Sequence, residues 1–316
     1  MTPGPRRVAA VDMGTNSTRL LVADVAADGT LTEVDRLLRI TRLGEDVDRG
    51  GVLVPAAMER VFAVLDEFHG VAAGHGAARV LATATSAVRD ASNGRAFLAE
   101  IEHRTGFATR LLSGDEEALL TFRGITSTRP IAGDTLIVDI GGGSTELIAG
   151  SPSGVGFHVS TQMGCVRLTE RWLAATDPPT AEELERCAAD VRAILAAAVP
   201  DEVRRGPAGE APRAAIGVAG TVTTVAALDL GLTEYDPERI HGHSITSTAT
   251  RRERERLAGL ALEERRRVPG IEPQRAPVIV AGAVILDEIL DWFGLDAIEA
   301  SERDILHGAV LLAAEA

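Results

Sequence analysis

Short apolar runs alternate with longer amphipathic segments along the chain of 316 residues. The runs at 8–11, 79–83, 135–138 and 214–218 have the length of buried β-strands. Helical signals mark the segments 96–105, 180–199, 250–268, 278–292 and 305–314. Residues 200–213 are rich in Gly, Pro and charge and read as a surface loop. Strands that alternate with helices in this way predict an α/β fold.

Two of the predicted strands run into the same kind of turn. Asp12 opens the sequence Asp-Met-Gly-Thr-Asn-Ser, and Asp139 opens Asp-Ile-Gly-Gly-Gly-Ser. A second strand follows each turn, at 18–23 and at 145–149, so each segment predicts a β-hairpin with a polar tip. The two aspartates are 127 residues apart, about the length of one domain. The repeat therefore indicates two duplicated lobes that face each other across a cleft.

Composition narrows the chemistry that this chain can perform. All 32 basic residues are arginine, because the sequence contains no lysine. A P-loop, a protein-kinase site and Schiff-base catalysis each need a lysine and are thereby excluded. The net charge of −14 and the aromatic content of 3% argue against a nucleic-acid partner. Two isolated cysteines, with no signal-peptide core or membrane span, indicate a cytoplasmic protein without a membrane partner.

The hairpin tips carry the first candidates for chemistry. Asp12 and Asp139 end strands where open α/β sheets bind ligands, although each could simply cap its own turn. The glycine run at 141–143 can bring backbone N–H groups close to an anion. A carboxylate beside such a loop needs a cation, so Asp139 and Glu146 are candidate Mg²⁺ ligands. The alternative for Glu146 is a solvated position on its strand.

Two further polar segments open helices. Residues 113–118 hold three consecutive carboxylates, which by themselves are typical of a helix N-terminus. Residues 85–90 follow a strand, and hydroxyl groups, N–H groups and Arg89 there could clamp phosphate oxygens. Arg89 could equally pair with Asp90 or Glu116 on the surface. The histidines at 241 and 243 have no third metal-ligating neighbour and read as loop or core residues.

Together these motifs resemble the exopolyphosphatase / guanosine pentaphosphate phosphohydrolase family of the actin-like ATPase superfamily. The alanine- and arginine-rich composition is similar to that of its actinobacterial members. The matching segments cover most of the chain in order and are 11–19, 83–91, 113–118, 138–147, 163–170, 217–221, 269–271 and 275–276.

The resemblance assigns roles that spacing alone does not. It implies that Glu117 is the catalytic base that activates water and that Asp139 and Glu146 hold magnesium and position that water. It also implies a set of phosphate-binding positions on the hairpin tips and on two further loops. These positions are Asp12, Gly14, Asn16, Ser17, Arg19, Ser86, Arg89, Gly141, Gly142, Gly143, Ser144, Thr145, Gly220 and Thr221.

The implied fold has two RNase H-like lobes of the actin-like ATPase superfold with a cleft between them. Residues 1–126 and 300–316 are expected to form the first lobe, with the last helix packed there, and residues 127–299 the second. The implied reaction is magnesium-dependent hydrolysis of the terminal phosphate of inorganic polyphosphate. Guanosine pentaphosphate as a substrate and a homodimer as the assembly are left open.

Two other classes share this superfold: a small-molecule kinase and a non-catalytic nucleotide-sensing or cytoskeletal relative. The acidic motif around Glu117 favours water as the phosphoryl acceptor over a kinase substrate. The sequence departs from the family at Pro277, where relatives often carry an aspartate. The contacts that such a carboxylate would make are therefore not expected here. The chain ends at Ala316 and resembles the short form of the family, so we expect a preference for short polyphosphates and distributive cleavage.

Overall fold

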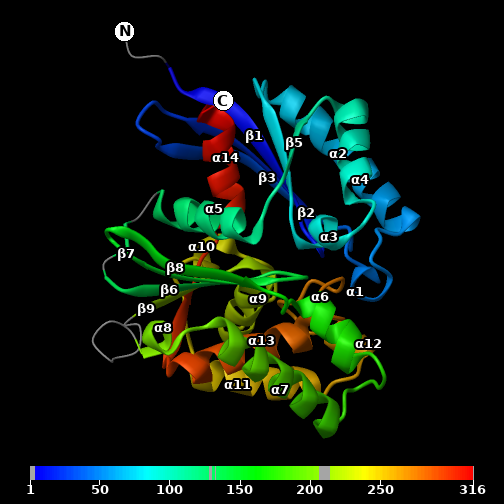
Figure 1. Ribbon diagram of the computed structural model, residues 1–316, viewed down its shortest axis with the longest axis vertical. Helices are drawn as coiled ribbons and strands as arrows, with labels where there is room; N and C mark the ends of the chain where they lie inside the picture. The colour runs from blue at the N-terminus through cyan, green and yellow to red at the C-terminus, as the bar shows by residue number, and fades with distance from the viewer. Residues whose placement is uncertain (1–3, 128–129, 132, 206–213, 316) are drawn as a thin grey trace. The chain divides into compact units, whose positions relative to one another are not determined.

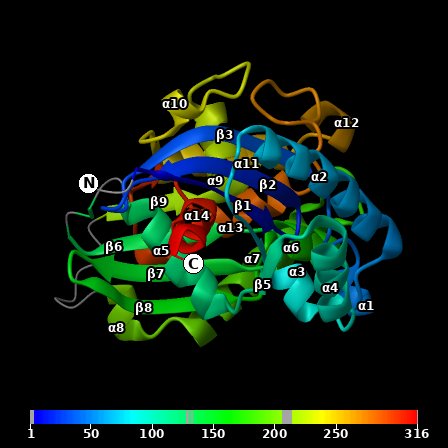
Figure 2. The ribbon, with the colours of Figure 1, turned by 90° about the horizontal axis from the view of Figure 1, so that it is seen from above.

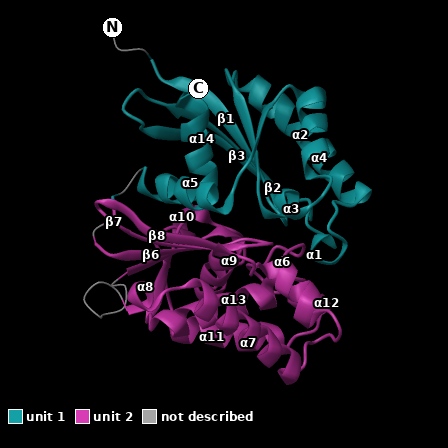
Figure 3. Ribbon diagram, in the orientation of Figure 1, with its two compact units in different colours: residues 1–130, 303–316 teal, residues 131–302 magenta. Residues whose placement is uncertain are grey.

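The computed structural model describes residues 4–127, 130–131, 133–205 and 214–315. The chain divides into two compact units, which Figure 3 shows in different colours. Unit 1 comprises residues 1–130 together with 303–316, and unit 2 comprises residues 131–302. The C-terminal segment therefore belongs to the same unit as the N-terminal strands.

Unit 1 is built on a five-stranded sheet with the order β3-β2-β1-β4-β5. β1, β2 and β3 pair antiparallel, whereas β4 pairs parallel with β1 and β5 parallel with β4. The strands are β1 (Arg6–Met13), β2 (Ser17–Val25), β3 (Leu31–Ile40), β4 (Val80–Ala84) and β5 (Ala108–Leu111). The helices are α1 (Val47–Gly50), α2 (Pro55–Gly74), α3 (Ser86–Asp90), α4 (Gly94–Thr105), α5 (Gly114–Thr126) and α14 (Ile305–Glu315).

Alternate residues of β1 pack on opposite faces of this sheet, as the period of a strand requires. Ala9 and Val11 join a core cluster with residues of α2 and α4. Ala10 joins a second cluster with Leu306 and Val310 of α14. α14 contacts β1, β2 and β4 (Figures 1 and 2), which confirms that the last predicted helix packs on the first lobe.

α5 and α14 approach each other so closely that only glycine fits at the crossing. A Cβ on Gly124 of α5 would lie 2.0 Å from the carbonyl oxygen of Asp304. A Cβ on Gly308 of α14 would lie 2.1 Å from the carbonyl oxygen of Leu120. Because both obstructions are backbone atoms, a side chain at either glycine would push the two helices apart. The contact fixes α14 against the helix that carries Glu117.

Unit 2 repeats the plan of unit 1. Its six strands have the order β10-β11-β9-β6-β7-β8, in which β6, β7 and β8 pair antiparallel and β9 pairs parallel with β6. The strands are β6 (Thr135–Ile140), β7 (Thr145–Ser151), β8 (Gly154–Thr161), β9 (Ala214–Val218), β10 (Ser244–Thr246) and β11 (Ala297–Ala300). If β10 is set aside, the order matches that of unit 1 strand for strand, which confirms the predicted α/β class with two RNase H-like lobes.

The helices of unit 2 pack mainly through one large core cluster. Residues of α7, α9, α11 and α13 join alternate residues of β6 in it. The helical segments are α6 (Cys165–Leu168), the π-helical turn η1 (Thr169–Leu173), α7 (Ala181–Ala198), α8 (Asp201–Arg205), α9 (Ala219–Asp229), α10 (Pro237–Ile240), α11 (Ser247–Ala258), α12 (Leu262–Arg265) and α13 (Ile279–Phe293). The helix predicted at 278–292 is confirmed as the buried α13.

Two predicted elements are wrong in part. The charged helix expected at 250–268 ends at Ala258, with Gly259 as its C-cap, and resumes as α12, whose first N–H, that of Leu262, donates to Asp177 at 2.9 Å. The loop expected at 200–213 contains the short helix α8, and residues 206–213 lie outside the described residues. The capping box predicted at Thr180 is confirmed as the start of α7.

Substituting the crossing glycine tests the packing of α14. Gly308→Ala should lower the free energy of unfolding by about 3 kcal/mol, the upper end for overpacking, because backbone atoms obstruct the new methyl group. Gly70→Ala is the matched control, since Gly70 lies on the exposed side of α2 with nothing within 4 Å of its Cβ position. That change should instead stabilise by about 0.5–1 kcal/mol. Equal effects in urea unfolding would contradict the close crossing.

Candidate active site

The two predicted hairpins have the same tip geometry. In the β1–β2 tip the N–H of Gly14 donates to the carbonyl oxygen of Ser17 at 2.9 Å. In the β6–β7 tip the N–H of Gly141 donates to the carbonyl oxygen of Ser144 at 3.0 Å. The sequence repeat thus corresponds to a structural repeat. Each of the two turns is closed by a hydrogen bond between backbone groups.

In the tip of unit 1, backbone carbonyl oxygens accept hydrogen bonds from the segment that follows β3. The N–H groups of Thr41 and Arg42 donate to the carbonyl oxygen of Asn16 at 3.1 and 2.9 Å. The N–H of Gly44 donates to the carbonyl oxygen of Thr15 at 2.8 Å. These bonds hold the negative ends of the tip peptides on the protein side, which suits anion binding by the opposite, N–H side.

The tip of unit 2 is held in the same way by the segment that follows β8. The N–H groups of Val166 and Arg167 donate to the carbonyl oxygen of Gly142 at 2.9 and 3.2 Å. The Nε of Arg167 donates to the carbonyl oxygen of Gly143 at 2.8 Å. The matching carbonyls are therefore occupied in both units. The donors come from the family motif at 163–170, whose structural role was not predicted from the sequence.

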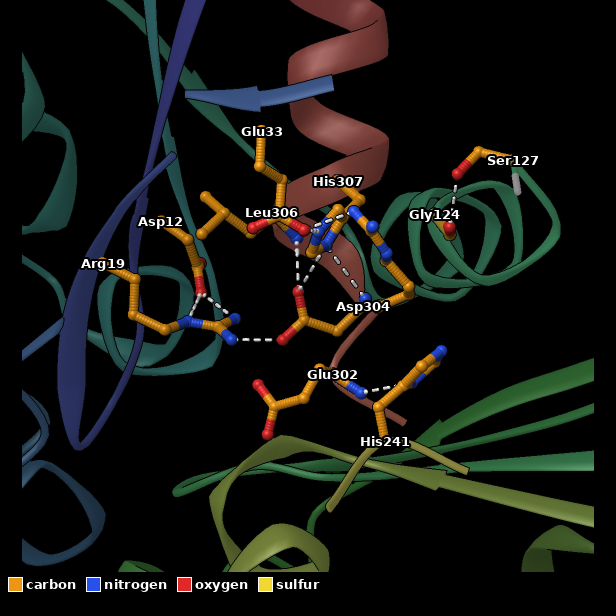
Figure 4. Close-up of polar contacts among 11 residues, drawn as sticks. Asp12, Arg19, Glu33, Gly124, Ser127, His241, Glu302, Asp304, Leu306 and His307 are labelled. Atoms are coloured by element: carbon orange, nitrogen blue, oxygen red, sulfur yellow. Dashed lines mark hydrogen bonds and ion pairs between the residues drawn. The ribbon is translucent and has the colours of Figure 1, made fainter. Parts of the chain in front are cut away.

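Asp12 and Arg19 lie directly opposite each other on β1 and β2 and form a buried ion pair. Nε and Nη2 of Arg19 donate to Oδ2 of Asp12 at 3.1 and 2.6 Å, and Nη1 donates to Oδ2 of Asp304 (Figure 4). Burial raises the pKa of Asp12 despite Arg19, whereas the charge of Arg19 and a contact with His307 outweigh burial and lower the pKa of Asp304. Phosphate binding by Arg19 stays a prediction, because three of its N–H donors already serve two carboxylates.

His307 extends this network to β3. Its Nδ1 accepts from the N–H of Asp304 at 3.3 Å, and its Nε2 lies 3.2 Å from Oε1 of Glu33 (Figure 4). Since Nδ1 is an acceptor, Nε2 carries the proton and donates to Glu33. The hydrogen bond from His307 lowers the pKa of Glu33 to about 2. The network ties the start of α14 to the β1–β2 hairpin.

Glu117 and Arg89 form the second buried ion pair of unit 1. Glu117 lies in the first turn of α5 and is 4% exposed. Nη1 of Arg89, in the last turn of α3, donates to Oε1 of Glu117 and, at 2.8 Å, to the carbonyl oxygen of Leu112. The alternative left open from the sequence, a surface pair of Arg89 with Asp90 or Glu116, is therefore wrong. Glu116 instead completes a capping box with Ser113 and pairs with Arg110.

Asp139 and Glu146 lie directly opposite each other on β6 and β7, so their side chains share one face of the sheet. They are 7% and 3% exposed, so the solvated alternative for Glu146 is wrong. Ser160 donates to Oε1 of Glu146 at 2.7 Å. In the described part of the chain no group of three or more His, Cys, Asp and Glu side chains is arranged for a metal. Two carboxylates fit Mg²⁺, which commonly completes its shell with water and substrate phosphates.

Arg275 is a candidate phosphate-binding residue to which the sequence analysis assigned no role. A Cβ on Gly220 would lie 1.5 Å from Nη1 of Arg275, so the guanidinium rests directly on the backbone at the start of α9. Thr221 hydrogen-bonds the thiol of Cys165, whose pKa burial raises to about 11. The predicted positions Gly220 and Thr221 thus lie beside a cation. Arg275 belongs to a family motif, and that motif was the signal that could have found it.

Four further predicted positions lie in the two hairpin tips and in α3. Asn16, Ser86, Ser144 and Thr145 are all buried. Thr145 donates to the carbonyl oxygen of Met163, which anchors the end of the unit 2 tip. The histidines at 241 and 243 lie in the loop between α10 and β10, as expected. None of the described helices is long and apolar enough to cross a membrane.

Comparison with known proteins identifies the family. Residues 21–315 match the Ppx/GppA phosphatase family, so the chain belongs to this family and the resemblance of its motifs is confirmed. Exopolyphosphatase 2 of Mycobacterium tuberculosis is 39% identical over 318 residues, which cover 96% of this chain and 98% of that protein. A crystal structure of an exopolyphosphatase-like protein is 36% identical with a TM-score of 0.91 and 98% coverage of both chains. An exopolyphosphatase from Cytophaga hutchinsonii is 26% identical with a TM-score of 0.88, also over 98% of both chains.

The contact between the guanidinium of Arg275 and the backbone of Gly220 can be tested by a double-mutant cycle. Gly220→Ala should leave the protein folded, because the methyl group meets only the end of a flexible side chain, but should displace the guanidinium. If the glycine acts through Arg275, Gly220→Ala and Arg275→Ala should each reduce kcat/KM for polyphosphate, and the double variant should lose no more than the worse single variant. Strictly additive losses would contradict the coupling.

Proposed function

We propose that this protein is an exopolyphosphatase, which hydrolyses the terminal phosphoanhydride bond of inorganic polyphosphate. The observation that carries the proposal is Glu117, a buried carboxylate at the start of α5 that is paired with Arg89. Relatives named exopolyphosphatase align over nearly the whole chain, which supports the same substrate class here. The residues that the structure describes show no feature that favours guanosine pentaphosphate over polyphosphate.

Glu117 suits the role of general base. In the reaction the water oxygen bonds to the terminal phosphorus, the bridging P–O bond breaks, and the water proton passes to a carboxylate oxygen of Glu117. A base that moves one proton in the transition state contributes about 10²–10⁴-fold to the rate. The hydrogen bond from Arg89 fixes the position of this carboxylate at the start of α5.

The backbone N–H groups of the hairpin tips supply the phosphate contacts. Phosphoryl transfer depends mainly on positioning and on stabilising charge that spreads over the phosphoryl oxygens. The bonds to the carbonyl oxygens of Asn16, Gly142 and Gly143 fix the tips before substrate arrives, so little reorganisation is needed during the reaction. The net charge of −14 does not exclude a polyanionic substrate, because the local field at a site, and not the total charge, steers a ligand.

Asp139 and Glu146 are the residues that would hold magnesium. A cation held there would supply positive charge to the phosphoryl oxygens of the substrate. Their own contribution is to present two carboxylates on one face of the β6–β7 hairpin. Cys165 and Cys187, both free and buried thiols, are consistent with a cytoplasmic location.

Removing the base should separate catalysis from folding. Glu117→Gln should lower kcat by about 10²–10⁴-fold while leaving KM for polyphosphate within a few-fold, because glutamine keeps the shape and can still accept from Arg89 but cannot take up the water proton. Glu116→Gln is the matched control, since Glu116 is the neighbouring carboxylate and serves the capping box and Arg110. Steady-state phosphate release gives both constants. A Glu117→Gln enzyme with wild-type kcat would remove this residue from the mechanism.

Metal dependence tests the carboxylate pair of unit 2. Chelation should abolish phosphate release and added magnesium should restore it. Asp139→Asn should raise the magnesium concentration needed for half-maximal activity, because a neutral amide is a weaker ligand for this hard cation. Asp190→Asn should not, since Asp190 pairs with Arg171 and Trp172 away from this hairpin. Full activity of the chelated enzyme would show that the metal assignment is wrong.

A further inference from the structure

Arg42 has an unusual backbone conformation beside the unit 1 tip. Its φ is 49°, in the left-handed region that residues with a Cβ avoid. Within the described ranges only Arg42, Asp46 and Ala219 share a positive φ without being glycine. Residues held in such conformations cluster at functional sites, where the surrounding structure maintains them.

Hydrogen bonds hold Arg42 in this conformation from both sides. Its N–H donates to the carbonyl oxygen of Asn16 at 2.9 Å, so it is fixed directly to the tip. Its carbonyl oxygen accepts from Nη2 of Arg60 at 3.3 Å and from the N–H of Glu45 at 3.2 Å. Nε of Arg60 also donates to the carbonyl oxygen of Thr41 at 2.7 Å. The peptide is therefore rigidly placed before any ligand binds.

The segment that contains Arg42 packs against two predicted phosphate-binding elements, the β1–β2 tip and α3. A Cβ on Gly44 would lie 2.2 Å from Cγ2 of Thr15 and 3.3 Å from Cβ of Ala87. Thr15 belongs to the β1–β2 tip, and Ala87 lies in α3 between Ser86 and Arg89. The segment thus lies against both the tip and α3, and Arg42, two residues before Gly44, is half-buried there.

We propose that Arg42 is a substrate-binding residue that contacts phosphate groups of the polyphosphate beside the unit 1 tip. The proposal rests on the proposed function. A guanidinium can donate two parallel hydrogen bonds to a phosphate, and it remains charged at every pH at which the protein folds. Arg42 would bind the ground state and the transition state alike, so its loss should appear in KM. The alternative is that Arg42 only pairs with the acidic residues that follow it.

The test uses glycine, which removes the side chain and relieves the backbone strain together. Arg42→Gly should raise KM for sodium tripolyphosphate about 10- to 100-fold, the range for a lost hydrogen-bonded charge, with kcat within about threefold. Its melting temperature should be no lower than that of the wild type, because glycine adopts this φ freely. Arg42→Gln keeps a Cβ and should show the same rise in KM.

Asp46→Gly is the matched control, because Asp46 has a φ of 60° in the same loop and carries the opposite charge. It should leave KM unchanged. A wild-type KM for Arg42→Gly, or an equal rise for Asp46→Gly, would overturn the proposal. Failure of the wild type to release phosphate from tripolyphosphate would instead contradict the proposed function. Calorimetric binding of tripolyphosphate to the wild type and to Arg42→Gly would still decide the role of Arg42.

Discussion

The direction of the peptide groups in the two hairpin tips is the constraint on which the candidate site depends. A peptide presents a donor on one side and an acceptor on the other, and an acceptor facing a phosphate would repel it. In both units the chain that leaves the third strand donates to the tip carbonyls and holds them on the protein side. Gly164 allows this approach in unit 2, since a Cβ there would lie 2.3 Å from the carbonyl oxygen of Gly142.

Buried charge is the second constraint. Asp12, Arg19 and Asp304 neutralise one another in part within unit 1, as do Arg89 and Glu117. A buried carboxylate without a partner is costly, so removal of one partner from either group would destabilise the free protein. The same pairs give a polyanion charged groups to engage, and phosphate that binds Arg89 competes directly with Glu117.

The sequence predicted the repeated hairpins and most elements because both depend on local patterns. Alternating strands, the Asp-x-Gly turns and the capping box at Thr180 each lie within a few residues. The break after Ala258 has a local signal, Gly259, but the hydrogen bond that satisfies the first N–H of the next helix comes from Asp177, 85 residues away from Leu262. The pairing of Arg89 with Glu117 was missed because it depends on how α3 and α5 pack.

The same contrast between local patterns and long-range contacts applies to the candidate site residues. Their identities could be read from motifs, but the function of the motif at 163–170 could not, because it acts through backbone bonds to Gly142. The contact of Arg275 with Gly220 likewise joins residues that are 55 positions apart in the sequence. Such contacts follow from tertiary packing, and no local propensity encodes them.

Hydrolysis of polyphosphate in ¹⁸O-labelled water, with magnesium and without any nucleotide, tests the central claim most directly. If Glu117 activates water against the terminal phosphorus, each released orthophosphate should carry one ¹⁸O from solvent and the shortened chain should carry none. Phosphate release that requires a nucleotide, or label that appears in the shortened chain, would contradict the account.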